Sequence, residues 1–185
     1  MAWDDALFER FAEATVRMAR GQLPGYGHPH VILPYPPKEE LTCIEAVRNL
    51  PARLRQEGLR AAVVPIAPYV AKATERYARR RLTEGEDYKR LEQDMADVQN
   101  GVIGRTVEVC APDLVAKAAD DTVLVLCRLG ALYPFGHVSA LLERLFSAGV
   151  RSTLAVVYPG TADGTALSFL GRLDPTGAYR GHIVT

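Results

Sequence analysis

The feature that most constrains the fold is a series of short apolar runs, each separated from the next by a segment with helical periodicity. The strongest run is TVLVLC at 122–127, which is continuously apolar and rich in β-branched residues. Similar runs occur at 31–35, 60–66 and 151–159. Continuous runs of this length are typical of strands that are buried on both faces, as in the middle of a parallel sheet.

Strands that alternate with helices predict an α/β fold with three layers. We expect a mainly parallel, Rossmann-like sheet of about four or five strands flanked by helices, with GHIV near the end as an edge strand. The length of 185 residues is most simply a single domain, 1–185. Helices are expected at 4–20, 37–57, 68–98 and 137–147, and after Pro112.

Prolines and glycines are expected to interrupt two of these helical segments. Pro51 cannot lie in a helix interior without a kink, so we expect a break near Asn49. The glycines at 101 and 104 favour a loop, in which TVEVC at 106–110 is a candidate short strand. The residues of the segment after residue 37 that are expected to face inward are Leu41, Ile44 and Val47.

The longest helical region, at about 68–98, is expected to be an excursion from the α/β layers. Thr83 and Glu86 fit a capping box that would restart a helix after a break. Tyr88, Leu91 and Met95 then form an apolar stripe among many charged residues. Two interpretations stay open: a solvated, ion-paired helix face, or a helical hairpin that docks a partner through the stripe.

Composition narrows the classes of function. Lys and Arg together number 22, as do Asp and Glu, so the chain has no net charge to favour nucleic acid or an anionic membrane. No apolar run reaches the ~18 residues of a membrane span, and the acidic N-terminal segment is unlike a signal peptide. Three scattered cysteines, with Cys127 read as a small buried hydrophobe, indicate a reducing, cytoplasmic compartment.

The segment Gly130–Gly136 superficially resembles a phosphate-binding loop. In a Walker A loop the second glycine follows four intervening residues and precedes Lys and Ser or Thr. Here five bulky residues intervene, one of them Pro134, and His137 follows. The loop therefore lacks both the charge and the open backbone, although a helix N-terminus could still attract an anion.

Aromatic residues instead stand out in the two loops expected at the carboxyl ends of neighbouring strands. Such loops carry ligand sites in open α/β sheets. These residues either pack over the sheet or offer a surface to another protein, and the candidates for interaction are Tyr133, Pro134, Phe135, Tyr158, Pro159 and Gly160. Asp163 could bind Mg²⁺, but with Gly164 it is more typical of a turn.

No other residues complete a catalytic or metal-binding set. His28 and His30 form an HxH pair without a third ligand at suitable spacing, and all four histidines are expected at the surface or at helix caps. The serines at 139 and 168 lack the context of a nucleophile elbow. The basic cluster at 76–81 is followed at once by acidic residues, which favours intramolecular pairing over nucleic acid. We therefore expect no cofactor and no metal.

Several short motifs, taken in order over nearly the whole chain, resemble the BrxB family. The motifs are YPPKEEL at 35–41, VVPI at 63–66, GALYPF at 130–135, VVYPG at 156–160, LSFLGRL at 167–173 and AYRGHIV at 178–184. The resemblance implies a small cytosolic component of a BREX bacteriophage-defence system. It further implies no assigned catalysis and association with the PglZ-type, alkaline-phosphatase-like subunit.

Two functions follow as hypotheses. The first is a non-enzymatic adaptor that binds the PglZ-type protein, and possibly other BREX components, through the aromatic loops or the stripe. The second is a degenerate nucleotide- or phosphate-binding α/β enzyme that acts at the carboxyl ends of the strands. Direct DNA binding is the least favoured, because composition shows no basic excess.

Overall fold

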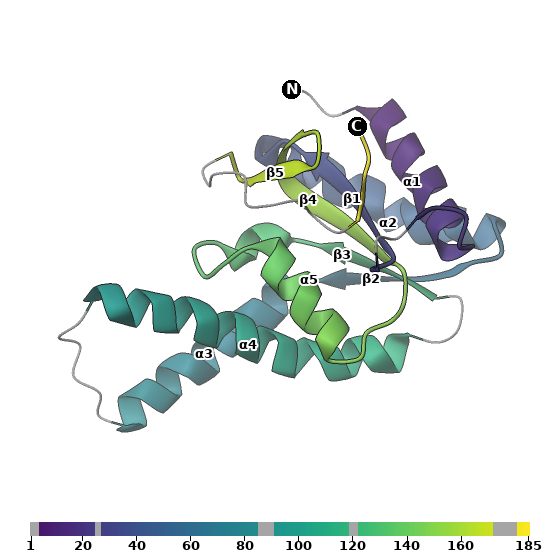
Figure 1. The fold of residues 1–185 in the computed structure, drawn as a ribbon. Coiled ribbons are helices and arrows are strands. Elements are labelled where there is room, and N and C mark those ends of the chain that lie inside the picture. The colour runs from purple at the N-terminus through teal and green to yellow at the C-terminus, as the bar shows by residue number, and fades with distance from the viewer. Residues whose placement is uncertain (1–3, 25–26, 85–90, 119–121, 172–180) are drawn as a thin grey trace.

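In a computed structural model, which describes residues 4–24, 27–84, 91–118, 122–171 and 181–185, a sheet lies between two layers of helices (Figure 1). The strands are β1 (His30–Tyr35), β2 (Arg60–Pro65), β3 (Thr122–Cys127), β4 (Leu154–Asp163), β5 (Ala166–Phe169) and β6 (His182–Ile183). The α-helices are α1 (Asp5–Ala19), α2 (Glu40–Gln56), α3 (Ala67–Glu84), α4 (Leu91–Lys117) and α5 (Val138–Ser147). Two short 3₁₀ helices are η1 (Pro37–Glu39) and η2 (Leu129–Leu132).

The sheet confirms the predicted α/β class. Its strand order is β2-β3-β4-β1-β6, and every neighbouring pair in this order is parallel. β3 lies inside the sheet and all six of its residues are buried, as its continuous apolar sequence requires. The last expected strand is present as β6, which pairs with β1.

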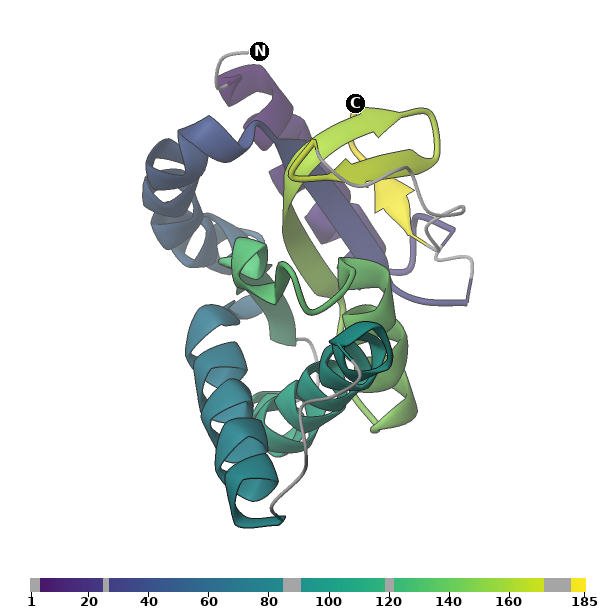
Figure 2. The same cartoon turned by 90° about the vertical axis from the view of Figure 1, so that its left-hand side faces the viewer.

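Each face of the sheet has its own core. On one face α1 and α2 cover the strands, with Phe11, Leu50 and Leu54 fully buried. On the other face α4, α5 and the start of α3 enclose a second core that contains Leu126 and Leu141. The three layers are visible in Figures 1 and 2. No helix in the described ranges has the length and the apolar composition needed to cross a bilayer.

The expected break near Asn49 is wrong, because α2 continues through Pro51. The residues that α2 buries are Cys43, Val47, Leu50 and Leu54. These four residues recur at intervals of four, three and four, so a single face of the helix packs against the sheet on both sides of the proline. Packing of that face outweighs the hydrogen bond that the proline cannot donate.

The loop and short strand expected at 99–110 are also wrong, since this whole segment belongs to α4. A Cβ at position 101 would come 2.5 Å from Cε2 of Tyr77, so Gly101 allows α3 and α4 to pack closely. Val102, Val107 and Cys110 are buried in the core below α4. Pro112, expected to begin a helix, instead lies inside α4.

The helical excursion is present as α3 and α4, which cross each other and extend to the lower left in Figure 1. The second helix of this excursion is longer than predicted, because α4 continues to Lys117. Its C-terminal part packs on the sheet and contributes to the core. Glu86 of the expected capping box lies outside the described residues. Tyr88 does too, as do the side chains of Leu91 and Met95, whose backbone belongs to α4.

The sequence did not predict the hairpin that β4 forms with β5. β4 continues four residues past Pro159 and pairs with β5 in antiparallel fashion, with Gly160 opposite Phe169. The turn expected at Asp163 and Gly164 is confirmed, and Gly164 has the positive φ of 58° that such turns need. The hairpin extends the sheet past the carboxyl end of β1.

Candidate functional site

The candidate site lies at the edge where the parallel strands end, which faces the viewer in Figure 2. β1 leads into η1 and α2, β3 leads into η2 and α5, and β4 leads into the hairpin. The two predicted interaction loops come together here. A Cβ on Gly130 would lie 3.9 Å from Cγ of Pro159, so η2 packs against the end of β4.

The loop after β3 is folded onto itself rather than open. The N–H of Tyr133 donates to the carbonyl of Gly130 at 3.1 Å, and the N–H groups of Phe135 and Gly136 donate to the carbonyl of Leu132 at 2.7 and 3.0 Å. These donors are therefore used within the loop, whereas a phosphate-binding loop directs its N–H groups at the ligand. The backbone geometry favours the packing interpretation over a phosphate cradle.

We expect this loop to leave nucleotides unbound. A ligand at ~100 times its Kd would add about 2.7 kcal/mol to the free energy of unfolding. In a thermal-shift series with ATP, GTP and inorganic phosphate, each with and without Mg²⁺, we expect no change in Tm. A Tm that rises with nucleotide concentration would contradict this expectation and support the enzyme hypothesis.

The three aromatic-loop residues differ in exposure. Tyr133 is 41% exposed and Pro134 is exposed beside it. The carbonyl of Pro134 accepts a hydrogen bond from Nε2 of Gln99 in α4, at 3.1 Å. Phe135 is half-buried and packs against the core. The loop is thus anchored through Phe135 and Gln99, while Tyr133 projects into solvent.

The second predicted segment does not present its side chains to solvent. Tyr158, Pro159 and Gly160 are all buried. The ring of Tyr158 packs 5.6 Å from that of Phe169, centroid to centroid. For this segment the burial favours the packing interpretation over the interaction surface, because β4 continues through it into the hairpin. Its part at this edge is to support η2.

Two exposed residues at the same edge were not predicted. Leu41, expected to face inward, is 76% exposed in the first turn of α2, because it lies off the helix face that contains Cys43 and Val47. Arg128 is exposed and adopts a left-handed conformation, with a φ of 56°, between β3 and η2. Such a conformation in a residue other than glycine is uncommon and clusters at functional sites. We call Leu41, Arg128, Tyr133 and Pro134 the carboxyl-edge face.

Beneath this face lies a polar cluster that joins α2 to the ends of β1 and β3. The Tyr35 hydroxyl donates a hydrogen bond to Glu40, and burial, followed by this bond, raises the pKa of Tyr35. Burial, and to a smaller extent the charge of Glu40, raises the pKa of the Cys43 thiol. The same two causes raise the pKa of Cys127 to about 11, although the charge of Arg128 acts in the opposite direction. Both thiols are therefore protonated at neutral pH, whereas a nucleophilic cysteine needs its thiolate.

The cysteines and histidines of the described residues form no group that could hold a metal ion. All three cysteines are free and buried, which confirms the interpretation of Cys127. His28 and His30 lie at the opposite edge of the sheet, with their rings stacked at 5.3 Å. The expectation that every histidine lies at the surface or at a cap is wrong for His30, which is 4% exposed in β1.

The burial of His30 predicts a loss of stability in acid. Burial, and secondarily the nearby His28, lowers the pKa of His30 from 6.5 to about 4. The unfolded chain therefore takes up this proton first, so stability is fully present above pH 6.5 and falls as the pH drops toward 4. We expect His30→Gln to remove up to about 3 kcal/mol of this pH dependence, measured by urea unfolding at several pH values.

The control for this experiment is His137→Gln, at the other edge of the sheet. It should leave the acid destabilisation as in the wild type. If His30→Gln unfolds with the same pH dependence as the wild type, the burial of a neutral His30 is not what makes the protein sensitive to acid.

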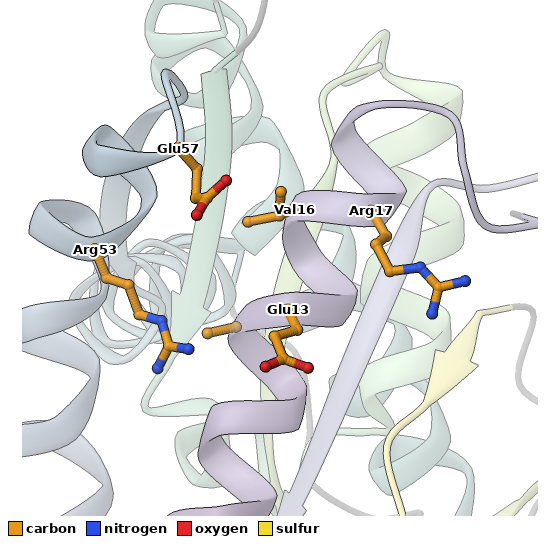
Figure 3. A pocket seen from close by; sticks show the side chains of 6 residues that line it. Glu13, Val16, Arg17, Arg53 and Glu57 are labelled. Carbon is orange, nitrogen blue, oxygen red and sulfur yellow. The ribbon is translucent and has the colours of Figure 1, made fainter.

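A groove of about 270 Å³ lies between α1 and α2, away from the carboxyl-edge loops (Figure 3). Its lining residues are Ala12, Glu13, Val16, Arg17, Arg53 and Glu57. Arg53 pairs with Glu9, and Nη2 of Arg20 lies 3.1 Å from Oε2 of Glu57. Charged groups of both signs that pair with each other on a solvated surface are typical of helix packing, so the groove offers no catalytic set.

Comparison with known proteins identifies a family for this chain. The family model described as BREX protein BrxB matches residues 70–183, from α3 to β6, which is well over half of the chain. No curated protein and no solved structure matches the chain. The matched region includes the loop after β3 and the hairpin, and thus most of the carboxyl edge of the sheet.

Proposed function

The chain belongs to the BrxB family, a component of BREX phage-defence systems, and from this we propose that it is a non-enzymatic adaptor whose carboxyl-edge face binds the PglZ-type, phosphatase-like subunit. The adaptor acts in the cytoplasm, where BREX systems meet phage DNA after adsorption. It needs neither a cofactor nor direct contact with nucleic acid.

The observation that carries the proposal is the position of the exposed apolar side chains. In the described part of the chain the large hydrophobic residues that are exposed are Leu41, Val115 and Tyr133. Leu41 and Tyr133 follow β1 and β3 at the same edge of the sheet. Single exposed apolar residues are common on monomers, but here an exposed tyrosine and an exposed arginine, both types enriched in hot spots, share an edge with an exposed leucine.

The electrostatics of the edge support a docking role over a catalytic one. The thiols of Cys43 and Cys127 are protonated at neutral pH, and the N–H donors of the loop after β3 bind carbonyls of the loop itself. The exposed side chains at this edge include the apolar Leu41, the aromatic Tyr133 and the cationic Arg128. A partner that fits this surface offers an apolar pocket bordered by carboxylates.

Titration calorimetry with the purified PglZ-type protein tests the proposal. We expect saturable binding with a micromolar or lower Kd, weakened by salt to the small extent expected of one arginine contact. The absence of binding at ~100 µM of both proteins would contradict the assignment of this partner.

A further inference from the structure

The outer strand β2 offers an unpaired edge at the end of the sheet. Among the described strands, β2 comes first in the order β2-β3-β4-β1-β6 and pairs with β3 alone, from Arg60 opposite Thr122 to Pro65 opposite Cys127. Figure 1 shows β2 at this margin of the sheet. An edge strand presents a row of main-chain donors and acceptors that can pair with another chain.

The hydrogen-bond pattern identifies the groups that point outward. The N–H of Ile66 donates to the carbonyl of Cys127 at 2.9 Å. In a parallel pair alternate residues bond to the neighbour, so Val64 and Ala62 also face β3, while Ala61 and Val63 face away. The N–H of Leu124 in β3 donates to the carbonyl of Thr153 at 2.9 Å and so points away from β2. The alternate residues of β3 therefore face β2, which agrees with this assignment.

The outward groups are the N–H and C=O of Ala61 and Val63 and the C=O of Pro65. Nothing in the described ranges forms a hydrogen bond with those of Ala61 or Val63. The side chains of Ala61, Ala62 and Val63 are small, apolar and only half-buried. Natural edge strands are commonly protected by an inward-pointing charge, a bulge or a covering segment. β2 has a regular register over all six residues, and its protective residues lie at its two ends, as the charge of Arg60 and as Pro65.

We propose that β2 pairs with β2 of a second copy of this chain, antiparallel and about a two-fold axis through Val63. In this register the two Val63 residues exchange both of their hydrogen bonds. The N–H of Ala61 donates to the C=O of Pro65 in the other copy, and the reciprocal bond forms on the other side of the axis. Every outward N–H therefore finds an acceptor. Pro65 has no N–H, so the C=O of Ala61 in the other copy receives no bond from it.

The side chains fit the same register. Ala61 faces Pro65 of the second copy, Ala62 faces Val64 and Val63 faces its equivalent, so the cross-strand pairs inside the overlap are apolar. Arg60 faces Ile66, so no like charges meet. The chain has no net charge to oppose self-association. A two-fold pairing is closed, because it uses the free edge of β2 in both copies.

This dimer would have a consequence for assembly. Strands of the two copies run in opposite directions across the axis, so the carboxyl edges of the two sheets lie at opposite ends of the continuous sheet. Leu41 and Tyr133 follow β1 and β3 rather than β2, whereas Arg128 follows Cys127, which pairs with Pro65 at one end of the dimer seam. The inference is independent of the proposed adaptor function, and either can fail alone.

Analytical ultracentrifugation of the full chain at ~100 µM tests the pairing through charges at position 63. We expect the wild type to have twice the mass of one chain. Val63→Lys and Val63→Glu each place like charges opposite one another across the axis, so each alone should weaken the dimer at least ~10-fold. An equimolar mixture of the two variants should restore the dimer, which a merely misfolded variant could not do. Val63→Thr is the uncharged control and should remain dimeric.

Three results would overturn the proposal: a wild type with the mass of a single chain, a dimer that Val63→Lys does not weaken, and a mixture that does not restore the dimer. Amide hydrogen exchange of the wild type tests the pairing without any substitution. The amides of Ala61 and Val63 should exchange more slowly at ~100 µM than at ~1 µM, and equal rates would likewise contradict the pairing.

Discussion

Replacing Gly160 with alanine is expected to lower the free energy of unfolding by about 3 kcal/mol. A Cβ at this position would overlap the carbonyl oxygen of Ser168 on the paired strand and lie 2.7 Å from Cε1 of Tyr158. The obstacle is backbone rather than the end of a flexible side chain, so β4 and β5 would have to separate. Urea unfolding followed by circular dichroism measures the change.

The control for Gly160 is Thr161→Ala, which alters an exposed neighbour in the same hairpin. It should change stability by no more than about 0.5 kcal/mol. A Gly160→Ala variant as stable as the control would mean that the hairpin is not closed against β4 as described, and η2 would lose its support at Pro159.

The second large effect is expected on partner binding. Tyr133→Ala should weaken the affinity for the PglZ-type protein about 30-fold, equivalent to about 2 kcal/mol, because an exposed tyrosine at the centre of an interface is a typical hot spot. Adding Leu41→Ser should weaken it further. Both residues are exposed, at 41% and 76%, so the melting temperature should stay close to that of the wild type. Calorimetric titration and thermal unfolding of the same samples measure the two quantities.

Val115→Ser is the matched control for this pair of substitutions. Val115 is 45% exposed, like Tyr133, but lies in the C-terminal part of α4 rather than in a loop at the carboxyl edge. It should leave the affinity unchanged. If Val115→Ser weakens binding and Tyr133→Ala does not, the partner surface lies on α4. If Tyr133→Ala unfolds the protein, the residue packs the loop instead.

The sequence was sufficient for the parallel strands of the sheet, because burial on both faces leads to a continuously apolar sequence. TVLVLC is apolar at every position, and β3 is buried at every position. The proline in RAAVVPI ends β2, as an edge strand allows. These properties belong to single segments, so they can be recognised without knowledge of the partner segments.

The helices that failed depend on contacts that no local pattern encodes. Gly101 and Gly104 are poor helix formers, yet α4 contains both, because the first lets the Tyr77 ring approach and the helix buries Val102 and Cys110. Pro51 is likewise unfavourable inside a helix, yet α2 continues through it. In each case tertiary packing over a long face outweighs the local propensity, and this balance is visible only once the layers are assembled.

The site was half predictable for a related reason. That loops at the carboxyl edge would meet follows from a parallel sheet, and the aromatic loop at 133–135 became a candidate in this way. The parallel sheet alone does not determine which side chains of these loops are exposed. Tyr158 is buried because β4 continues into an unpredicted hairpin, and Leu41 is exposed because the inward face of α2 begins at Cys43.

The measurement that tests the adaptor account most directly is size-exclusion chromatography with light scattering, on the chain alone, on the PglZ-type protein alone and on their mixture. The account predicts co-elution of the wild-type mixture at a defined stoichiometry, and separate elution when the chain carries Tyr133→Ala and Leu41→Ser. Separate elution of the two wild-type proteins at ~100 µM, well above the micromolar Kd expected, would contradict it.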